Sequence, residues 1–332
     1  LCGTQQICTV FKDIGFTEFY YIYGSAGDSS CTTEIMDILK VCALVRKMKK
    51  TRFGTIGGRA PGMTEIAYDE LEIKKKLGAR IVEITESEFW EVYEGVNTRE
   101  VLEEEDRIKS LFSCIKSDME SLRDGVRWYI TLKKLILKYD LNGLTVGCYT
   151  RYMGKVCLGF SLLSQEGYVC GCEGDVNSTV MMYILQQLSG GSVNNTDLLY
   201  PDEDANTILF SHCGSTDPAL SATEEICLVP VRLMDSGVCV TFTCKPGTVT
   251  LADLVGHGGT LRMSVMTGES VNCPMEFPGS PMKVRFSRPV LDICRDVAER
   301  GMGHHWMATY KDISRMLREY CRMTDIDYQT AL

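Results

Sequence analysis

Three side chains in this sequence are of the types that bind a divalent metal ion: Glu173, Asp197 and one member of the pair His304–His305. Glu173 follows a short apolar run, Asp197 closes a polar segment that comes after two glycines, and the histidines precede a second apolar run. Carboxylate oxygens together with one imidazole suit Mn²⁺, Mg²⁺ or a similar cation better than they suit a thiolate-type zinc site. The pattern therefore indicates an enzyme that acts on an oxygen-rich substrate.

Purely structural roles for the carboxylates remain open at this point. Glu173 and Asp175 both precede a predicted helix, and a carboxylate in that place stabilises the helix N-terminus. This role accounts for Asp175 better than for Glu173, which still belongs to the end of a predicted strand.

The histidines all lie in the C-terminal part of the chain, at positions 212, 257, 304 and 305. His212 ends a predicted strand and is either a ligand or a structural residue. His257 stands among glycines, and we expect it to be structural or exposed. Adjacent residues in an extended segment point to opposite faces, so we expect one of His304 and His305 to face a cleft while the other packs or contacts substrate.

The composition is that of an ordinary globular protein, with 332 residues, 45% hydrophobic and 24% charged. The net charge of −9 argues against a nucleic-acid partner, which needs clustered Lys and Arg. No apolar run approaches the roughly 18–20 residues that span a bilayer, so no membrane association is expected. The 16 cysteines are spread along the chain without a Cys-x-x-Cys motif, which favours buried thiols in a reducing, cytoplasmic location.

The first part of the chain alternates between strand-like and helix-like segments. Strands are predicted at 16–23, 52–56, 80–84, 144–148 and 168–172, and helices at 32–50, 64–77, within 98–139, 156–165 and 178–188. In the helix over 32–50 we expect Ile35, Ile38, Leu39, Cys42 and Val45 to lie on one face. Such alternation predicts a parallel sheet, and ligands collect beyond the carboxyl ends of its strands, where Glu173 lies.

After residue 207 the pattern changes to short strands separated by Gly, Pro and Asp turns. Strands are predicted at 208–211, 226–231, 238–244, 248–254 and 260–265, followed by a helix at 289–299, a strand at 305–309 and a helix at 311–321. The expected fold class is α/β: Rossmann-like parallel α/β domains followed by a C-terminal β-rich, antiparallel barrel-like α+β domain. We place the boundaries at 1–50, a remnant of an N-terminal α/β domain, 51–190, a middle Rossmann-like domain, and 191–332, the β-rich domain.

The N-terminal remnant has a consequence for assembly. The sequence opens at Leu1 without a methionine, and we expect it to begin inside a fold whose N-terminal portion is missing. A lone strand at 16–23 and helix at 32–50 would leave an open sheet edge and an uncovered apolar face. We therefore expect a homo-oligomer with the active site near a subunit interface.

The loop GGRAPG at residues 57–62 lies between a predicted strand and a predicted helix. It lacks both the Gly-x-Gly-x-x-Gly spacing and the lysine of a phosphate-binding loop, so a tight turn is the favoured interpretation. Arg59 in this loop is a candidate for contacting substrate.

Several motifs resemble those of one known family. The segment CEGDVNSTVMMYILQQLSG at 172–190, followed by Thr196-Asp197, resembles the central segment of the L-fucose and L-arabinose isomerase superfamily. The stretches LCGTQQ at 1–6, GGRAPG at 57–62, KPGTVTLA at 245–252 and the pair 304–305 fit fucose-isomerase-like proteins in the same order. The resemblance covers essentially the whole chain, and its most specific part is 172–197.

The resemblance implies a Mn²⁺ ion, or another divalent cation, held by Glu173, Asp197 and His305. In that family the second carboxylate follows the glutamate by 24 residues, which is the spacing found here. By the same resemblance, His212 falls near a further metal-binding histidine of the arabinose isomerases. The residues that we expect to contact substrate are His304, His212, Arg59 and Trp306. Family members carry an additional N-terminal domain that this chain largely lacks.

The implied activity is that of an aldose–ketose isomerase in carbohydrate metabolism, acting on a pentose, deoxyhexose or hexose derivative through an enediol. Glu173 and Asp197 would serve both as ligands and as proton-transfer groups. Two alternatives stay open: a non-catalytic sugar-binding or regulatory homologue, and a metal-dependent sugar aldolase or hydrolase. The intact set of Glu173, Asp197 and His305 favours an enzyme over a binding protein.

Overall fold

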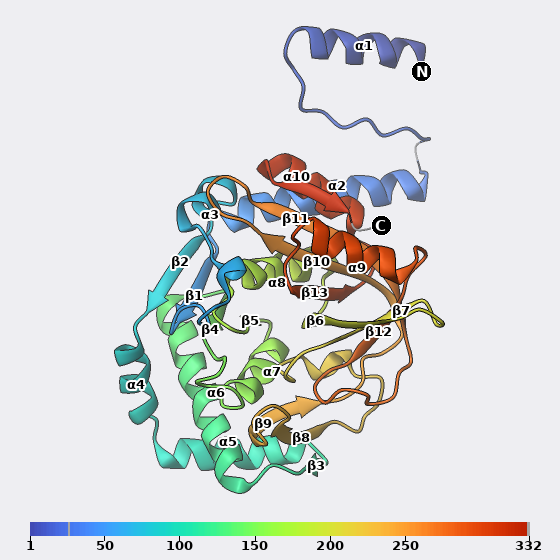
Figure 1. Cartoon of the computed structure of the whole chain (residues 1–332). Coiled ribbons are helices and arrows are strands. Elements are labelled where there is room, and N and C mark those ends of the chain that lie inside the picture. The colour runs from blue at the N-terminus through green and yellow to red at the C-terminus, as the bar shows by residue number, and fades with distance from the viewer. Residues whose placement is uncertain (26, 331–332) are drawn as a thin grey trace. The chain divides into compact units, whose positions relative to one another are not determined.

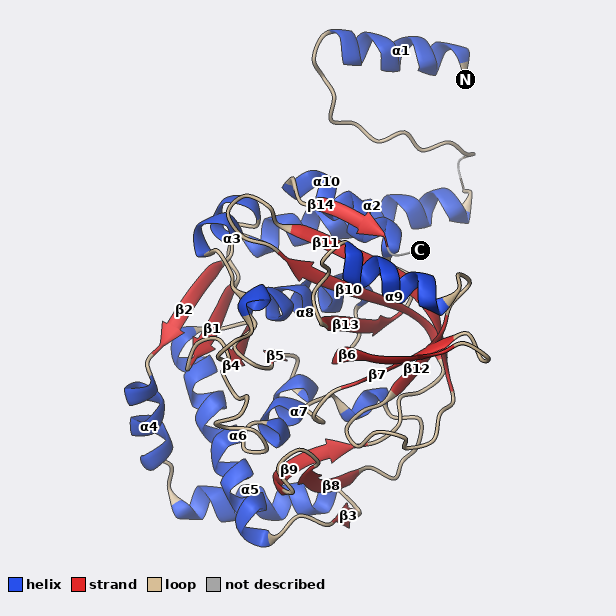
Figure 2. Ribbon diagram, in the orientation of Figure 1, coloured by secondary structure: helices blue, strands red, loops and turns tan. Residues whose placement is uncertain are grey.

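The computed structural model describes residues 1–25 and 27–330. By their contacts these residues form two compact units, Leu1–Lys40 and Val41–Leu332. Figure 1 follows the chain by colour, and Figure 2 shows the same view with helices, strands and loops distinguished. The predicted division at about residue 190, inside the second unit, stays a prediction.

The first unit contains helix α1 (Cys2–Asp13) and the beginning of helix α2 (Ser29–Met48). The strand predicted at 16–23 is wrong, because these residues form no regular secondary structure. The rings of Phe16 and Phe19 pack on α1 instead, with their centroids 5.3 Å and 5.7 Å from that of Phe11. High β-propensity forms a strand only where a partner accepts its backbone hydrogen bonds.

Helix α2 confirms the helix predicted at 32–50 with its start moved three residues earlier. Ile35 and Leu39 of the predicted apolar face are exposed, as the expectation of an uncovered face implies. The buried residues of the helix are Val41, Leu44 and Met48, in its C-terminal part, and they belong to the second unit.

The second unit begins with a parallel sheet, as predicted. Its strands are β1 (Arg52–Ile56), β2 (Arg80–Ile84), β4 (Gly143–Val146) and β5 (Val169–Gly171), in the order β2-β1-β4-β5. Helices α6 (Met119–Tyr139) and α7 (Cys157–Gln165) share one apolar core with Ile56, Leu144 and Val146 of the sheet. Helix α8 (Val176–Ser189) and α3 (Glu70–Lys76) share the other core with Phe53 and Val169, so the sheet is covered on both faces.

The helical segments between these strands are more divided than the sequence indicates. The helix predicted at 64–77 is a short 3₁₀ turn η1 (Thr64–Ile66) followed by α3, whose N-terminus Asp69 caps by accepting the N–H of Glu72. The polar region at 98–139 separates into α5 (Thr98–Leu111), a short strand β3 (Cys114–Ile115) and α6, and helix α4 (Glu86–Glu94) precedes it.

The C-terminal part contains the predicted antiparallel barrel. Six strands follow one another as β10-β13-β6-β7-β12-β11, and pairing of β10 with β11 closes the ring. They are β6 (Val193–Asp202), β7 (Thr207–Ser211), β10 (Gly247–Val255), β11 (Arg262–Val271), β12 (Met282–Arg285) and β13 (His305–Tyr310). Strand β14 (Asp327–Thr330) adds to β11 in parallel. Closure pairs the edges of the six strands with one another.

The remaining elements surround the barrel. Strands β8 (Cys227–Val231) and β9 (Ser236–Thr241) form a hairpin that pairs with β3, and 3₁₀ turn η2 (Pro218–Leu220), α9 (Val290–Glu299) and α10 (Ser314–Thr324) complete the chain. Helix α8 contacts β1, β4 and β5 of the parallel sheet and β6, β10 and β13 of the barrel, and so joins the two sheets. None of the helices in the described part of the chain is both long and apolar enough to cross a membrane.

Candidate metal centre

Glu173 lies in the tight turn between strand β5 and helix α8. Its φ of +66° is in the left-handed region that non-glycine residues seldom occupy, and such strain is typical of functional sites. The turn is fixed on both sides: the N–H of Glu173 donates to Cys148 Sγ at 3.3 Å, and its carbonyl accepts the N–H of Ala60 at 2.9 Å. Gly174 follows with a φ of +77°, and a Cβ there would lie 2.1 Å from the carbonyl oxygen of Gly58. The 57–62 loop therefore forms a close-packed support for this carboxylate.

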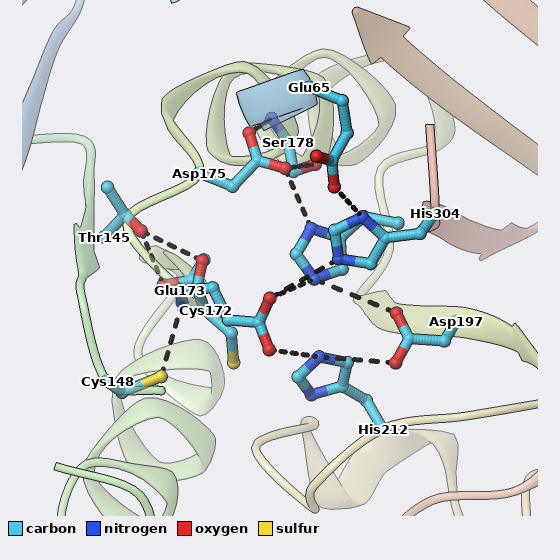
Figure 3. Close-up of polar contacts among 12 residues, drawn as sticks. Glu65, Thr145, Cys148, Cys172, Glu173, Asp175, Ser178, Asp197, His212 and His304 are labelled. Atoms are coloured by element: carbon cyan, nitrogen blue, oxygen red, sulfur yellow. Dashed lines mark hydrogen bonds and ion pairs between the residues drawn. The ribbon is translucent and has the colours of Figure 1, made fainter. Parts of the chain in front are cut away.

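The barrel presents the other two predicted ligands from neighbouring strands. In the antiparallel pairing of β6 and β13, His305 lies directly opposite Asp197, and Asp197 in turn pairs with Ser211 at the end of β7. His212 follows Ser211 and reaches the same place. Figure 3 shows the side chains of Glu173, Asp197, His212 and His304 converging.

Histidine nitrogens and carboxylate oxygens stand close enough to share an ion. His305 Nε2 is 3.5 Å from Glu173 Oε2 and 3.8 Å from Asp197 Oδ1. His212 Nε2 is 3.9 Å from Glu173 Oε1 and 3.8 Å from Asp197 Oδ2. Atoms from Glu173, His212 and His305 lie within 4.8 Å of one another, as do atoms from Asp197, His304 and His305.

Buried polar atoms at the centre of this cluster lack hydrogen-bond partners among the described residues. They include His305 Nε2 and Asp197 Oδ1. A buried polar atom without a partner costs roughly 1–3 kcal/mol, so each such atom calls for an explanation. A cation with ligand bonds of roughly 2.0–2.6 Å would satisfy both atoms at once.

His305 is held in the orientation of a metal ligand. Its Nδ1 donates to Asp175 Oδ2 at 2.8 Å, so Nε2 is directed at Glu173 and Asp197 and can bind an ion once its proton is displaced. Burial alone lowers the pKa of His305, but the hydrogen bond to Asp175 and the surrounding carboxylates outweigh burial and raise the pKa to about 9. Asp175 also caps helix α8, because its Oδ1 accepts the N–H of Ser178 at 2.9 Å. The expected helix-capping role of Asp175 is confirmed, and the same side chain orients His305.

The pKa values of the two further histidines are shifted in opposite directions. Burial lowers the pKa of His212, which is therefore a neutral imidazole. For His304, burial also lowers the pKa, but the hydrogen bond to Glu173 and the nearby carboxylates raise it overall. His304 Nδ1 lies 2.8 Å from Glu65 and its Nε2 lies 3.4 Å from Glu173 Oε2.

The carboxylate of Glu173 is ionised in this setting. Burial raises its pKa, but the hydrogen bond with His304 and the charges of the neighbouring histidines outweigh burial and hold the pKa below its usual value. An ionised carboxylate is the form that binds a cation or accepts a proton.

Two expectations about the histidine pair and its neighbour need correction. His304 and His305 do not point to opposite faces, since their ring centroids are 3.9 Å apart and both rings approach Glu173. The alternation rule fails because strand β13 begins at His305, so His304 lies before the extended segment. Trp306 is fully buried in the apolar core with no surface for a ligand, and we no longer propose it as a substrate contact.

The other predicted residues lie as follows. Arg59 is exposed at the 57–62 loop beside the Glu173 turn, with its side chain in no salt bridge among the described residues. His257 is exposed, as expected.

Sequence reasoning missed two residues that support the site. Glu65 contacts His304, and buried Asp253 accepts the N–H of Gly303 at 2.7 Å, so it fixes the turn that carries the histidines. Burial raises the pKa of Asp253 to about 7. Neither residue stands in a motif, because each reaches its partner only through long-range packing of the chain.

The sequence is similar to those of known sugar isomerases. Residues 198–327 match the model of the L-arabinose isomerase C-terminal domain. The sulfoquinovose isomerase of Priestia megaterium is 23% identical over 319 residues, covering 93% of this chain and 71% of the relative. The sulfoquinovose isomerase of Alkalicoccus urumqiensis shows the same identity and coverage. The L-arabinose isomerase of Shouchella clausii is 21% identical over 320 residues, covering 92% of this chain and 65% of the relative.

Proposed function

Because the chain is a member of the arabinose/fucose isomerase-like superfamily, we propose that it is a metal-dependent aldose–ketose isomerase that converts a sugar through an enediol. The observation that carries the proposal is the orientation of His305. Its Nε2, without a hydrogen-bond partner among the described residues, is directed at the carboxylates of Glu173 and Asp197 by the bond from Nδ1 to Asp175.

The donor set suits Mn²⁺ or a similar divalent cation. Two groups of possible ligands, Glu173–His212–His305 and Asp197–His304–His305, share His305. Glu173, Asp197 and His305 would hold the ion, and His212 supplies a further neutral imidazole beside them. A bound cation would supply Lewis-acid stabilisation of the negative charge that develops on the substrate oxygens. Two carboxylates balance its two positive charges.

The residues of the chain can carry the proton. Isomerisation removes a proton from C2 of the open-chain aldose and delivers one to C1, while the hydroxyl proton leaves O2 and the carbonyl oxygen O1 gains one. An ionised carboxylate of Glu173 or Asp197 accepts the C2 proton as base and returns a proton to C1 as acid. Asp197 is the more accessible of the two, with 30% of its side chain exposed against 9% for Glu173.

Two residues at the rim are proposed as substrate contacts. His304 is partly exposed, with 34% of its side chain accessible, and its Nε2 lies next to Glu173. It can exchange a hydrogen bond with a sugar hydroxyl and hold the Glu173 carboxylate in place. Arg59 is the second, because its loop packs on the Glu173 turn.

We also propose a homo-oligomer in a reducing compartment such as the cytoplasm. Helix α1 buries no residue, and Ile7, Val10 and Leu39 are exposed in the first unit, which leaves apolar surface for another subunit. All 16 cysteines are free thiols, as suits a reducing environment. Light scattering tests the first point: an active monomer would contradict it.

The test of function starts from protein freed of metal by a chelator. Adding Mn²⁺ to it in the presence of individual pentoses, deoxyhexoses and hexoses should yield the matching ketose, and without added metal the yield should vanish. A sugar-binding protein would give no product, and an aldolase would give shorter fragments. Either result would contradict the proposed isomerase.

A further inference from the structure

Two carboxylates face each other across the proposed metal centre. Glu173 approaches from the turn after β5 of the parallel sheet, and Asp197 approaches from β6 of the barrel. The two side chains therefore come from different walls of the site, and Figure 3 shows their carboxylates facing each other with His212 between them.

The distances to the imidazoles place the two carboxylates evenly. His305 Nε2 is 3.5 Å from Glu173 Oε2 and 3.8 Å from Asp197 Oδ1. His212 Nε2 is 3.9 Å from Glu173 Oε1 and 3.8 Å from Asp197 Oδ2. Each carboxylate therefore directs one oxygen toward each imidazole, and one of its oxygens can bind an ion while the other handles a proton. A sugar held between the carboxylates has a proton-transfer group on each side.

This arrangement matters because the enediol of a sugar is flat at C1 and C2. A proton delivered to C1 gives the ketose. A proton delivered to C2 on the face from which the first one left returns the starting aldose, whereas a proton delivered to the other face of C2 gives the C2 epimer. A protein that isomerises without epimerising needs a proton donor on one face of C2 only, and here a carboxylate lies on each side.

We propose that the protein also interconverts aldoses that differ only in their configuration at C2. The proposal rests on the isomerase function and adds a second product to it. Glu173 accepts the proton from C2, the electron pair of the C–H bond forms the C1–C2 double bond, and O1 gains a proton. Asp197 then donates its proton to C2 from the opposite side, while the proton on O1 leaves and the C1 carbonyl forms again. The two aldoses have the same composition, so the step needs no oxidant or reductant.

The protons balance through solvent. One turnover leaves Glu173 protonated and Asp197 ionised, so both groups must exchange protons with water before the next. Asp197 has 30% of its side chain exposed and reaches water itself. Glu173 has 9% exposed, but His304, with 34% exposed, contacts its Oε2 at 3.4 Å.

The first experiment uses the Mn²⁺-loaded wild-type protein at neutral pH in heavy water, with nuclear magnetic resonance to identify the products. The substrates are C2-epimeric pairs, namely glucose and mannose, galactose and talose, and arabinose and ribose. Each aldose that yields a ketose should also yield its C2 epimer, with deuterium at C2. The epimer can form directly or by way of the ketose, and either route requires protonation of C2 on its second face.

The outcomes separate this proposal from the isomerase function. Ketose formation with no epimer above the level of the chelated protein would overturn the proposal and leave the isomerase standing. If no aldose yields a ketose, the isomerase function fails and the proposal fails with it.

Variants of Asp197 then test which residue serves the second face. Asp197→Asn cannot donate the proton, so the ratio of epimer to ketose should fall by about 10- to 100-fold. Both products come from the same loaded protein, so the ratio does not depend on how much ion the variant holds. Asp197→Glu keeps a carboxylate but displaces it by one methylene, and it should retain part of the ratio. The matched control Asp106→Asn, at an exposed aspartate of α5, should leave the ratio unchanged.

A wild-type ratio in both Asp197 variants would refute the assignment, because Glu173 would then serve both faces of a sugar that binds in two orientations. If Asp197→Asn forms neither product, the ratio in Asp197→Glu decides: a lowered ratio supports the assignment, and the wild-type ratio overturns it.

Discussion

Asp175→Asn should separate the orientation of His305 from its charge. Asp175 accepts three hydrogen bonds in the structure. Oδ1 caps helix α8 through the N–H of Ser178, and Oδ2 accepts both the Ser178 hydroxyl at 2.5 Å and the proton on His305 Nδ1 at 2.8 Å. Asparagine is as good a helix cap as aspartate, so the fold should remain intact. What changes is the negative charge behind the imidazole.

The effect on metal binding depends on pH in a direction that the structure fixes. In the metal-free protein the pKa of His305 is about 9, so at pH 7 the ion must displace a proton from it. Affinity for Mn²⁺ in the wild type should rise by about tenfold per pH unit and level off near pH 9. In Asp175→Asn the pKa of His305 falls, because the hydrogen bond to the Asp175 carboxylate, which raises that pKa, is lost. The plateau in Mn²⁺ affinity should therefore begin at a lower pH. On the plateau the variant should bind about 10- to 100-fold more weakly, because the imidazole is less basic and less well oriented.

The assay is calorimetric titration of metal-free protein with Mn²⁺ between pH 6 and pH 10, with circular dichroism to establish that the variant is folded. We expect the two affinity curves to approach each other at low pH and to separate at high pH. A curve for Asp175→Asn that runs parallel to the wild type at all pH values would refute the reasoning. So would unchanged affinity on the plateau.

Four further predictions concern the same centre. Glu173→Gln should abolish turnover while part of the Mn²⁺ affinity remains, measured by ketose formation and by metal titration, because the amide keeps an oxygen ligand but removes one of the two carboxylates that move the proton. His305→Ala should weaken Mn²⁺ binding with activity partly restored by excess Mn²⁺, whereas the control His257→Ala should change neither. Gly174→Ala should lower the free energy of unfolding in urea by about 1–3 kcal/mol, because its Cβ meets the Gly58 carbonyl at a positive φ. In the metal-free protein, protonated His305 stabilises the folded state, because its pKa is raised above the ordinary histidine value of 6.5 to about 9. This stabilisation is complete at pH values below 6.5 and is lost as the pH rises through about 9, so the thermal unfolding midpoint should fall over that range. Intact turnover by Glu173→Gln would contradict the first prediction, and equal loss of metal in His305→Ala and His257→Ala would contradict the second. An unchanged urea unfolding midpoint in Gly174→Ala would contradict the third. Thermal stability that does not change with pH would contradict the fourth.

The strands of the parallel sheet could be predicted closely because their signals are local. β1 and β2 have the predicted bounds, since each is a short run ended by a glycine or by a helix-capping threonine. Strand β6 was missed because its polar start, Asn194–Thr196, has no strand pattern of its own. Its burial comes from β7 and β13 on its two sides. The segment at 16–23 shows the opposite case, since a strong strand pattern without a partner stays irregular.

The candidate metal ligands could be found from the sequence because the local residue pattern changes at each of them. Glu173 stands at the end of a strand, and the spacing to Asp197 carried the family resemblance. Glu65 and Asp253 could not be found, since their contacts with His304 and Gly303 join residues far apart in the chain.

The central claim is that the carboxylates at the Glu173–Asp197–His305 centre move a proton between neighbouring sugar carbons with the help of a divalent cation. Its most direct measurement is the reverse reaction in heavy water, from ketose to aldose, with nuclear magnetic resonance to locate deuterium in the product. We expect deuterium at C2 of the aldose with Mn²⁺-loaded protein, and no reaction with the chelated protein or with Glu173→Gln. An aldose formed without deuterium at C2 would indicate direct hydride transfer, and conversion by the chelated protein would show that no metal is needed; either result would contradict the account.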